Sequence, residues 1–238
     1  MSKLRKVAGK LKRVALPTKE EDEMSFWIND WDAGIRAGKL WGPNTLEYAG
    51  DTEVAEDYLG RRWQAARAEV NRILDEAGIE DKDYFKGKNV LDIGPGCVGF
   101  PDAVAEQANL GFGLDPLAQE YKDHDLLLED TKAIYLNSLA ETIPLLSDFL
   151  DVVVCRNALD HVEDPVVVMS EIHRTLKPGG ILILNVDLDA APTPAEPHEI
   201  TKAQLYEWLK EFNVDFEDEW EHGHAGGGHA IVVRAVRP

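Results

Sequence analysis

The chain has 238 residues, of which 44% are hydrophobic and 29% charged, values that are ordinary for a globular protein and exclude a fully disordered chain. No apolar run approaches the about 20 residues of a membrane-spanning helix, and no apolar segment follows the basic start as it does in a secretory signal. Cys97 and Cys155 are too few for a disulfide framework, so a reducing, cytoplasmic compartment is expected. The net charge of −19 disfavours sequence-independent binding to a polyanion such as DNA.

The first segment, residues 1–16, contains six basic residues and no acidic one. Its apolar residues recur at helical spacing with the bases mostly on the other side, which predicts a basic amphipathic tail. Such a helix can lie on the inner face of an anionic membrane and bring the protein to lipid-linked acceptors. A disordered or partner-packed tail is the alternative, because the helix is short. Pro17 and the acidic run from Glu20 to Glu23 are expected to break the pattern.

Residues 17–86 are expected to form an N-terminal helical or lid segment. The apolar spacing predicts a helix from about 53 to 77, with Gly78 as its C-terminal cap. Aromatic rings can stack on a sugar or an aryl acceptor, but core packing is expected for Trp27 and Trp31, which stand four residues apart on one helix face. Four of the six tryptophans lie in this segment: Trp27, Trp31, Trp41 and Trp63.

Short strand-like runs alternate with helical ones over residues 87–238. The alternation predicts an α/β domain with a largely parallel sheet. Ligands of such sheets bind beyond the carboxyl ends of the strands, near the point where the strand order reverses. The predicted strands are 89–93, 112–115, 133–136, 149–155, 181–186 and 230–236, and the predicted helices are 103–108, 165–176 and 202–212.

The strongest local signal is the glycine-containing turn after the first of these strands. Gly94, Gly96 and Gly99 match G-x-G-x-x-G, in which glycine allows unusual dihedral angles and a close approach of the backbone to a ligand. Alone, the pattern also fits a tight turn without a ligand. Asp115 ends the second strand, where a carboxylate can accept both hydroxyls of a ribose, although a solvated turn residue before Pro116 is the alternative. Together these features favour an adenosine-containing ligand.

Asp92 lies two residues before Gly94 and helps to separate two kinds of ligand. A carboxylate there faces the phosphates of a dinucleotide unfavourably, but it suits a ligand that carries an ammonium and a sulfonium group. The alternative for Asp92 is a strand-end residue that accepts hydrogen bonds from nearby backbone groups. An NAD(P)-dependent oxidoreductase is therefore the less favoured interpretation of the turn.

Four segments in chain order resemble the class I S-adenosylmethionine-dependent methyltransferases, in particular their small-molecule, type 11-like branch. The resemblance covers roughly 86–238, and Val98 delays the third glycine relative to the G-x-G-x-G of many members. The similar residues are 90–96 (first motif), Asp115 (acid after the second strand), 149–165 (fourth strand and loop) and 171–182 (helix and Pro-Gly-Gly turn into the fifth strand).

This resemblance implies a three-layer Rossmann-like fold, with a mostly parallel seven-stranded sheet and an antiparallel last strand. It also implies S-adenosyl-L-methionine as cofactor and S-adenosyl-L-homocysteine as product. Asp92 and the glycines would surround the methionine part, and Asp115 the ribose. Leu139 and Ala140 would flank the adenine, for which core packing is the alternative. The implied cofactor-binding set is Asp92, Gly94, Pro95, Gly96, Asp115, Pro116, Leu139, Ala140 and Asn157.

Methyl transfer from a sulfonium requires no covalent intermediate and no metal, but an oxygen acceptor profits from a group that removes its proton. His161 is the best candidate for this catalytic base, because its loop is expected at the methyl end of the cofactor and imidazole titrates near neutral pH. Packing or backbone bonding within the loop is the alternative. Asp160 is expected either to orient His161 or to act itself, and His198 is a lesser candidate.

His222, His224 and His229 flank a glycine-rich stretch and invite comparison with a metal site. A hairpin between the last two strands explains their spacing without a metal, and no cysteine pair supports one, so no metal is predicted. Cys97 and Cys155 are expected to be small buried residues rather than nucleophiles.

The sequence therefore predicts a methyltransferase that acts on a small polar acceptor. Residues 23–27 and 157–161 are weakly similar to methyltransferases that act on sugars or glycans, which favours a sugar hydroxyl. No Asn/Asp-Pro-Pro-aromatic motif follows the fourth strand, which argues against a nucleic-acid acceptor. The alternative from another class is a cofactor-binding regulatory or scaffold protein that has lost catalysis.

Overall fold

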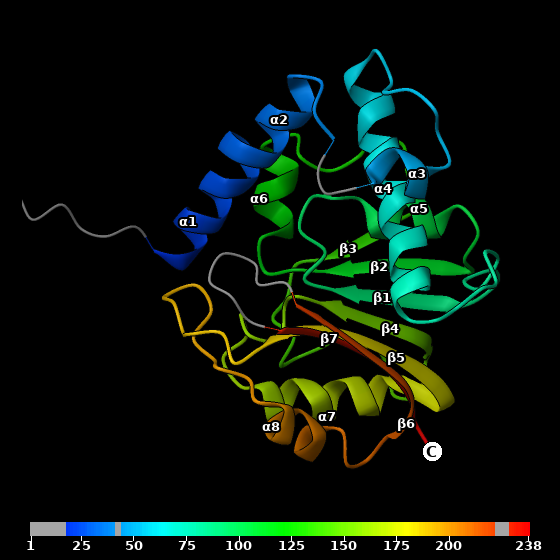
Figure 1. Ribbon diagram of the computed structural model, residues 1–238, viewed down its shortest axis with the longest axis vertical. Coiled ribbons are helices and arrows are strands. Elements are labelled where there is room, and N and C mark those ends of the chain that lie inside the picture. Colours follow the sequence, from blue (N-terminus) through cyan, green and yellow to red (C-terminus); the bar gives the residue numbers. More distant parts are fainter. Residues whose placement is uncertain (1–17, 41–43, 222–228) are drawn as a thin grey trace, which may run out of the picture.

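The computed structural model describes residues 18–40, 44–221 and 229–238. In these ranges a seven-stranded sheet lies between two layers of helices, and further short helices stand beside one end of it (Figure 1). The strands are β1 (Asn89–Ile93), β2 (Leu110–Leu114), β3 (Ile134–Leu136), β4 (Leu150–Arg156), β5 (Leu176–Leu188), β6 (Asn213–Glu221) and β7 (His229–Val236). The helices are α1 (Lys19–Phe26), the π-helix η1 (Trp27–Asp32), α2 (Ala33–Arg36), α3 (Thr45–Ala49), α4 (Tyr58–Glu76), α5 (Phe100–Ala105), α6 (Ala118–Asp123), α7 (Pro165–Thr175) and α8 (Lys202–Trp208). None of the helices in the described ranges combines the length and the apolar character needed to cross a bilayer.

The strand order is β3-β2-β1-β4-β5-β7-β6. Strands β1 to β5 pair in parallel, whereas β7 runs antiparallel to both β5 and β6. This confirms the predicted mostly parallel, seven-stranded sheet with an antiparallel last strand. The chain order reverses between β1 and β4, and the carboxyl ends of the parallel strands point toward α1 and α6 (Figure 1). A ligand site is therefore expected at this edge of the sheet.

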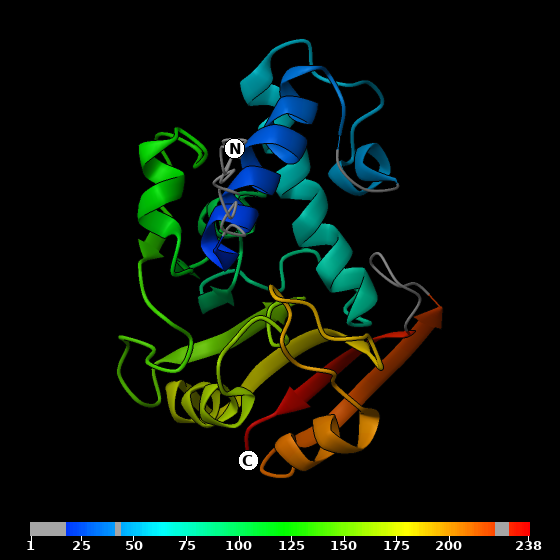
Figure 2. The ribbon, with the colours of Figure 1, turned by 90° about the vertical axis from the view of Figure 1, so that its left-hand side faces the viewer.

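Two apolar clusters, one on each face, hold the helices against the sheet. On one face, Ile172 of α7 and Leu205 of α8 pack over the strands. On the other face, Leu74 of α4 and Val104 of α5 pack on the same sheet (Figures 1 and 2). All four side chains are fully buried, which is the burial that stabilises a three-layer α/β fold.

The N-terminal helices form a third apolar cluster with α6. Trp31 and Ile35 are each only 1% exposed and pack near Tyr121 of α6, in agreement with the predicted core role of Trp31. The acidic run at 20–23, which was expected to break the pattern of residues 1–16, lies in the first turns of α1; the pattern itself falls outside the described residues. Thr18 accepts a hydrogen bond from the backbone N–H of Glu21, whose carboxylate accepts one from the N–H of Thr18, so the two residues form a capping box. Acidic side chains also suit the positive end of a helix.

Helix α4 begins later than its apolar spacing predicts. The side chain of Asp57 accepts a hydrogen bond from the N–H of Gly60 and thereby caps the helix at residue 58. At the other end, Gly78 has a φ of 64° and follows the last turn, as predicted. The helix therefore starts where a capping side chain, rather than the first apolar residue, satisfies its free N–H groups.

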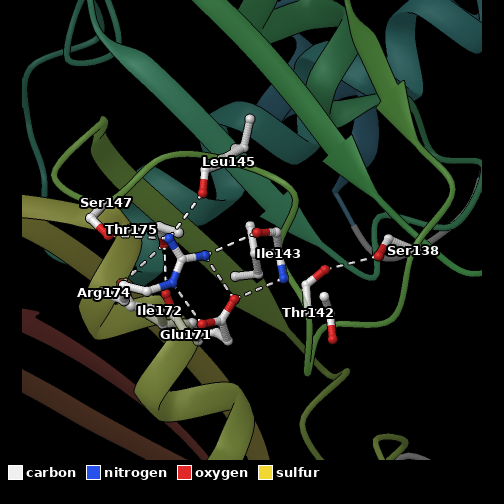
Figure 3. Close-up of polar contacts among 9 residues, drawn as sticks. All are labelled: Ser138, Thr142, Ile143, Leu145, Ser147, Glu171, Ile172, Arg174 and Thr175. Carbon is white, nitrogen blue, oxygen red and sulfur yellow. Dashed lines mark hydrogen bonds and ion pairs between the residues drawn. The ribbon is translucent and has the colours of Figure 1, made fainter.

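An ion pair on α7 fixes the loop that follows β3 (Figure 3). Arg174 bonds both carboxylate oxygens of Glu171, at 2.7 and 2.8 Å, and also donates to the backbone carbonyls of Ile143 and Leu145, each at 3.0 Å. Glu171 in turn accepts the backbone N–H of Ile143 at 3.0 Å. The guanidinium therefore holds the loop that carries residues 139 and 140 against the end of α7.

Candidate active site

The residues predicted to bind a cofactor follow the carboxyl ends of three neighbouring strands. Gly94 follows β1 and donates its N–H to the carbonyl of Leu114 at 2.9 Å. Asp115 follows β2 and donates its N–H to the carbonyl of Leu136 at 3.1 Å. Asn157 follows β4 and has a left-handed φ of 49°. The parallel sheet thus brings segments that are far apart in sequence to one edge.

The turn after β1 leaves no space for a side chain at its two glycines. Gly94 and Gly96 have φ values of 68° and 53°, in the left-handed region that favours glycine. A Cβ on Gly94 would stand 2.6 Å from the Cβ of Ala158, in the loop after β4. A Cβ on Gly96 would stand 2.1 Å from the ring of Trp27, in η1. The N-terminal segment therefore lies directly against the turn.

Asp115 is a buried carboxylate that is 6% exposed. One oxygen accepts the backbone N–H of Gly96 at 3.3 Å, and the other accepts that of Leu117 at 2.9 Å. Burial raises the pKa of this carboxyl to about 6, against the effect of the two backbone donors, and the charge of Glu23 acts in the same direction as burial. A cationic or hydroxyl-bearing ligand would stabilise the ionised form.

Asp92 is 5% exposed within β1, and burial followed by the charge of Glu69 raises its pKa well above the ordinary value. Arg156, at the end of β4, opposes this shift and is itself paired with Glu69 at 2.7 Å and Glu76 at 3.1 Å. This ion-pair network was not among the features predicted from the sequence. Its signal was present, because Glu69 and Glu76 are two turns apart on one side of α4.

These groups fit the adenosyl sulfonium that the sequence predicts. Asp92 and Asp115 are both buried, and the charge of Asp115 is one of the causes that raise the pKa of Asp92. A ligand with an ammonium and a sulfonium group would relieve this excess of negative charge, whereas the phosphates of a dinucleotide would add to it. The space in front of the two glycines is taken by Ala158 and the ring of Trp27, so contact of the turn with this ligand stays a prediction.

The remaining predicted cofactor residues lie around the same edge. Ala140, in the loop after β3, is 6% exposed and packs into the core, while half of the Leu139 side chain is exposed. Pro95 is buried within the turn, and Pro116 is exposed beside Asp115. Contact of these four residues with a cofactor stays a prediction.

His161 stands among carboxylates from three parts of the chain. Its Nδ1 lies 3.2 Å from Oε1 of Glu23 in α1, at ion-pair distance but not aligned as a hydrogen bond. Its Nε2 lies 3.8 Å from Oε1 of Glu196, in the loop after β5, and 4.0 Å from Oδ1 of Asp160. Lys19 donates a hydrogen bond to the His161 carbonyl and ties α1 to the same loop. The sequence predicted His161 and Asp160 as site residues, but not Glu23 or Glu196.

The carboxylates change the acid–base behaviour of His161. Burial by itself lowers the pKa of the imidazole, but the contact with Glu23 and the charge of Asp160 outweigh it and raise the pKa above its ordinary value. Burial also raises the pKa of Asp160. The imidazole of the free protein therefore keeps its proton to a higher pH than an isolated histidine.

The other candidates of the sequence lie apart from this cluster or outside the described residues. Cys97 and Cys155 are buried, as predicted, and burial raises the pKa of both thiols, so neither favours the thiolate form. The Nε2 of His198 lies 2.9 Å from the carbonyl of Val162, which fits a loop residue that bonds backbone. His229 is exposed in β7. The candidates outside the described ranges are His222, His224, Trp41 and the tail 1–16.

Comparison with known proteins gives a matching family and several relatives. Residues 91–184 match the profile of a family described as a methyltransferase domain. The ubiquinone biosynthesis O-methyltransferase of Pseudomonas aeruginosa is 32% identical over 146 residues, which are 56% of this chain and 61% of that protein. The protein of the same name from Pseudomonas syringae pv. tomato is 31% identical over 140 residues, 54% of this chain and 59% of the relative. The chain thus spans about three-fifths of the length of the curated relatives it matches.

Solved structures share the fold at low sequence identity. An S-adenosylmethionine-dependent methyltransferase from Mesorhizobium loti aligns with a TM-score of 0.58 and 18% identity, over 73% of this chain and 98% of that one. The [4+2]-cyclase SpnF aligns with a TM-score of 0.60 and 16% identity, over 93% and 97% of the two chains. These likenesses confirm the predicted fold. The two neighbours share this fold although their names describe different activities.

Proposed function

We propose that this chain, whose residues 91–184 belong to the methyltransferase domain family, transfers a methyl group from S-adenosyl-L-methionine to a hydroxyl of a small polar acceptor. One observation carries the proposal. The glycine turn, two buried carboxylates (Asp92 and Asp115) and the loop with His161 meet at one edge of the sheet, at the carboxyl ends of β1, β2 and β4.

The residues of this edge divide the work between cofactor and acceptor. When bound, the cofactor supplies an electrophilic methyl group on a sulfonium. Asp92 and Asp115 hold the positively charged, ribose-bearing ligand, and the turn at 94–96 supports it. Holding the acceptor at attack distance can supply about 7–11 kcal/mol of the barrier. His161 and Asp160 lie on the acceptor side and handle the proton of the hydroxyl.

The acceptor atom is the finer part of the proposal. An oxygen acceptor agrees with the name of the relatives, O-methyltransferases that share 31–32% identity with this chain. Within oxygen acceptors we favour a hydroxyl of a sugar or glycan, because of the weak similarities at 23–27 and 157–161. In the structure these two segments meet at the contact between Glu23 and His161, where acceptor choice would be made.

A second function from another class is binding without methyl transfer, as in a regulatory or scaffold protein. The [4+2]-cyclase among the structural neighbours has the same fold under the name of a different reaction, so the fold does not decide between these functions. An NAD(P)-dependent oxidoreductase remains the least favoured alternative.

Calorimetry followed by a turnover assay separates these functions. We expect S-adenosylhomocysteine to bind with a stoichiometry of one per chain, and NADH and NADPH not to bind. With a panel of sugars, phenols and amines, release of S-adenosylhomocysteine should be seen for hydroxyl acceptors. Binding of a nicotinamide cofactor alone would overturn the proposal. Cofactor binding with turnover confined to amines would refute the oxygen acceptor and keep the methyltransferase.

His161→Ala tests the acceptor side of the site. We expect kcat to fall by about 10²–10⁴, the usual contribution of a group that handles a proton, while the Kd for S-adenosylhomocysteine stays within a factor of about two. His124→Ala, at an exposed position after α6, is the matched control and should leave both constants unchanged. An unchanged kcat in His161→Ala would remove this residue from the mechanism.

A further inference from the structure

We infer that Asp160, His161 and Glu196 form a binding site for one divalent metal ion of the Mn²⁺ to Zn²⁺ class. The three residues come from the loop after β4 and the loop after β5, and one potential ligand atom of each lies within 4.8 Å of the other two. Two carboxylate oxygens and one imidazole nitrogen are a donor set that such ions accept.

The spacing of the three atoms suits an ion better than direct bonds between the side chains. The Nε2 of His161 is 4.0 Å from Oδ1 of Asp160 and 3.8 Å from Oε1 of Glu196, both too long for a hydrogen bond. Around an ion with bonds of about 2.0–2.2 Å, neighbouring ligand atoms stand about 3–3.5 Å apart. The two carboxylate oxygens would have to approach Nε2 of His161 by up to about 1 Å, and each other by up to about 1.8 Å.

The buried oxygen of Asp160 is an independent sign of a ligand. The side chain of Asp160 is only 8% exposed, and its Oδ1, the atom that faces the His161 ring, is buried without a hydrogen-bond partner. Buried oxygen atoms nearly always have a partner, because an unsatisfied one loses its hydration without compensation, and a charged one loses more. A metal ion at this position would supply the missing partner.

Glu23 completes the pattern from the opposite side of the ring. Its carboxylate lies 3.2 Å from Nδ1 of His161, while Nε2 faces the two potential ligands. A histidine that binds a metal commonly contacts a carboxylate through its other nitrogen, which fixes the ring and its tautomer. This carboxylate is not aligned as a hydrogen-bond acceptor here, so the Glu23 side chain would have to rotate before α1 could orient the ligand.

The net charge around His161 also favours binding of a cation. Glu23, Asp160 and Glu196 bring three carboxylates around one imidazole, which leaves an excess of negative charge even when the imidazole is protonated. Lys19, which donates to the backbone carbonyl of His161, adds one positive charge nearby, so one negative charge is still in excess. A divalent ion would balance the carboxylates.

The consequence for catalysis rests on the proposed function. Three protein ligands leave positions open for an acceptor hydroxyl, whose pKa falls on binding an ion. His161 and Asp160 would then act on the hydroxyl proton through the ion: the acidified hydroxyl would lose its proton to water, its oxygen would attack the methyl carbon, and the carbon–sulfur bond would break with its electron pair staying on sulfur. This gives the methyl ether and neutral S-adenosylhomocysteine. The site would then favour acceptors with two neighbouring oxygens.

Metal binding can be measured without turnover. The full chain, freed of metal by a chelator and dialysed, is titrated with Mn²⁺ while EPR records the free ion. We expect one saturable site per chain, which Zn²⁺ displaces. Asp160→Asn, His161→Ala and Glu196→Gln should each weaken Mn²⁺ binding at least about tenfold, and Glu23→Gln by about 10–100-fold. Glu199→Gln, an exposed acid in the same loop as Glu196, should bind as the wild type does.

Absence of saturable binding, or equal binding in all variants, would overturn the inference. Glu196 is 37% exposed at its side chain, so Glu196→Gln keeps the test valid if Asp160→Asn does not fold. Calorimetry of S-adenosylhomocysteine in the presence of EDTA is run in parallel. Cofactor binding without Mn²⁺ binding refutes the metal site alone, and Mn²⁺ binding without cofactor binding refutes the proposed function alone.

Discussion

The carboxyl group of Asp115 is buried and accepts hydrogen bonds from two backbone N–H groups. Its burial raises the pKa to about 6. The sign of this shift matters for both stability and binding. Because folding raises the pKa, the neutral carboxyl stabilises the fold at low pH, and this contribution is lost as the pH rises through about 6. A ligand that needs the carboxylate has the opposite dependence.

We expect S-adenosylhomocysteine to bind the wild type well above pH 6 and progressively more weakly below it. Only the ionised carboxyl can accept both ribose hydroxyls, so the Kd should rise by up to about tenfold per pH unit below the pKa. Calorimetric titrations from pH 5 to pH 8 measure this dependence. Asp115→Asn should bind weakly and without that pH dependence, whereas Asp123→Asn, at an exposed position of α6, should follow the wild type. A wild-type pH profile in Asp115→Asn would show that another group titrates.

The N-terminal helices pack directly against the turn after β1. The ring of Trp27, in η1, occupies the space next to Gly96, and its centroid lies 5.7 Å from that of Trp31 and 6.2 Å from that of Tyr121. The turn after β1 and the segment α1–η1 therefore share one packing arrangement. A substitution in either element should therefore change the packing, and with it the stability, of the other.

Gly96→Ala should lower both the Tm and the affinity for S-adenosylhomocysteine, because the new Cβ meets Trp27 and because φ is positive. Gly38→Ala is the matched control, since Gly38 also has a positive φ but no neighbour within 4 Å. Trp27→Ala combined with Gly96→Ala should recover part of the loss, with a coupling of about 0.5–3 kcal/mol in a double-mutant cycle measured by denaturant unfolding. Additive effects would contradict the direct contact.

Arg174→Ala tests how α7 fixes the loop after β3. We expect a loss of roughly 1–3 kcal/mol in the free energy of unfolding, because Glu171 and two loop carbonyls lose the guanidinium. In a chain of this size, each kcal/mol lowers the Tm by about 2–4 °C, which calorimetry resolves. Arg67→Ala, which removes an exposed pair with Asp51, should cost about 0–1 kcal/mol. Equal losses in the two variants would mean that the loop is held by other contacts.

At the scale of the whole molecule, three separate parts supply the candidate site. The sheet supplies the turn and the acids at its edge, α1 supplies Glu23, and the loop after β5 supplies Glu196. The chain carries a net charge of −19, and part of that negative charge is gathered around His161. The basic tail 1–16 has the opposite sign, and its role stays a prediction from the sequence.

The basic tail, residues 1–16, is predicted to bring the protein to an anionic membrane. If residues 1–16 form an interfacial helix, the full chain should sediment with anionic liposomes at low salt and detach as the salt rises. A variant without residues 1–16 should stay in the supernatant, since the rest of the chain is acidic. Neither protein should sediment with neutral liposomes. Equal partitioning of the two on anionic liposomes would end the membrane hypothesis.

Local pattern predicted the scaffold because strands, turns and caps depend on near neighbours. The strand at 89–93 was placed with its observed bounds, and the acid at 115 was placed at the end of the next strand. The start of α4 was misplaced, since a single capping bond from Asp57 outweighs apolar spacing. The acidic run at 20–23 was not foreseen as a helix start, although Thr18 and Glu21 form a capping box.

By itself, the sequence determined the position of six of the seven strands, the glycine turn and the two loop residues Asp160 and His161, whereas the strand β6 was not among the predicted ranges. Only the tertiary structure decided which of the 44 acidic residues stand beside them. Glu23 and Glu196 approach the ring of His161 from far along the chain in both directions, and neither local sequence indicates a contact with His161. Their contacts depend on how α1 and the loop after β5 pack on the edge of the sheet, which is a property of the whole fold rather than of any short segment.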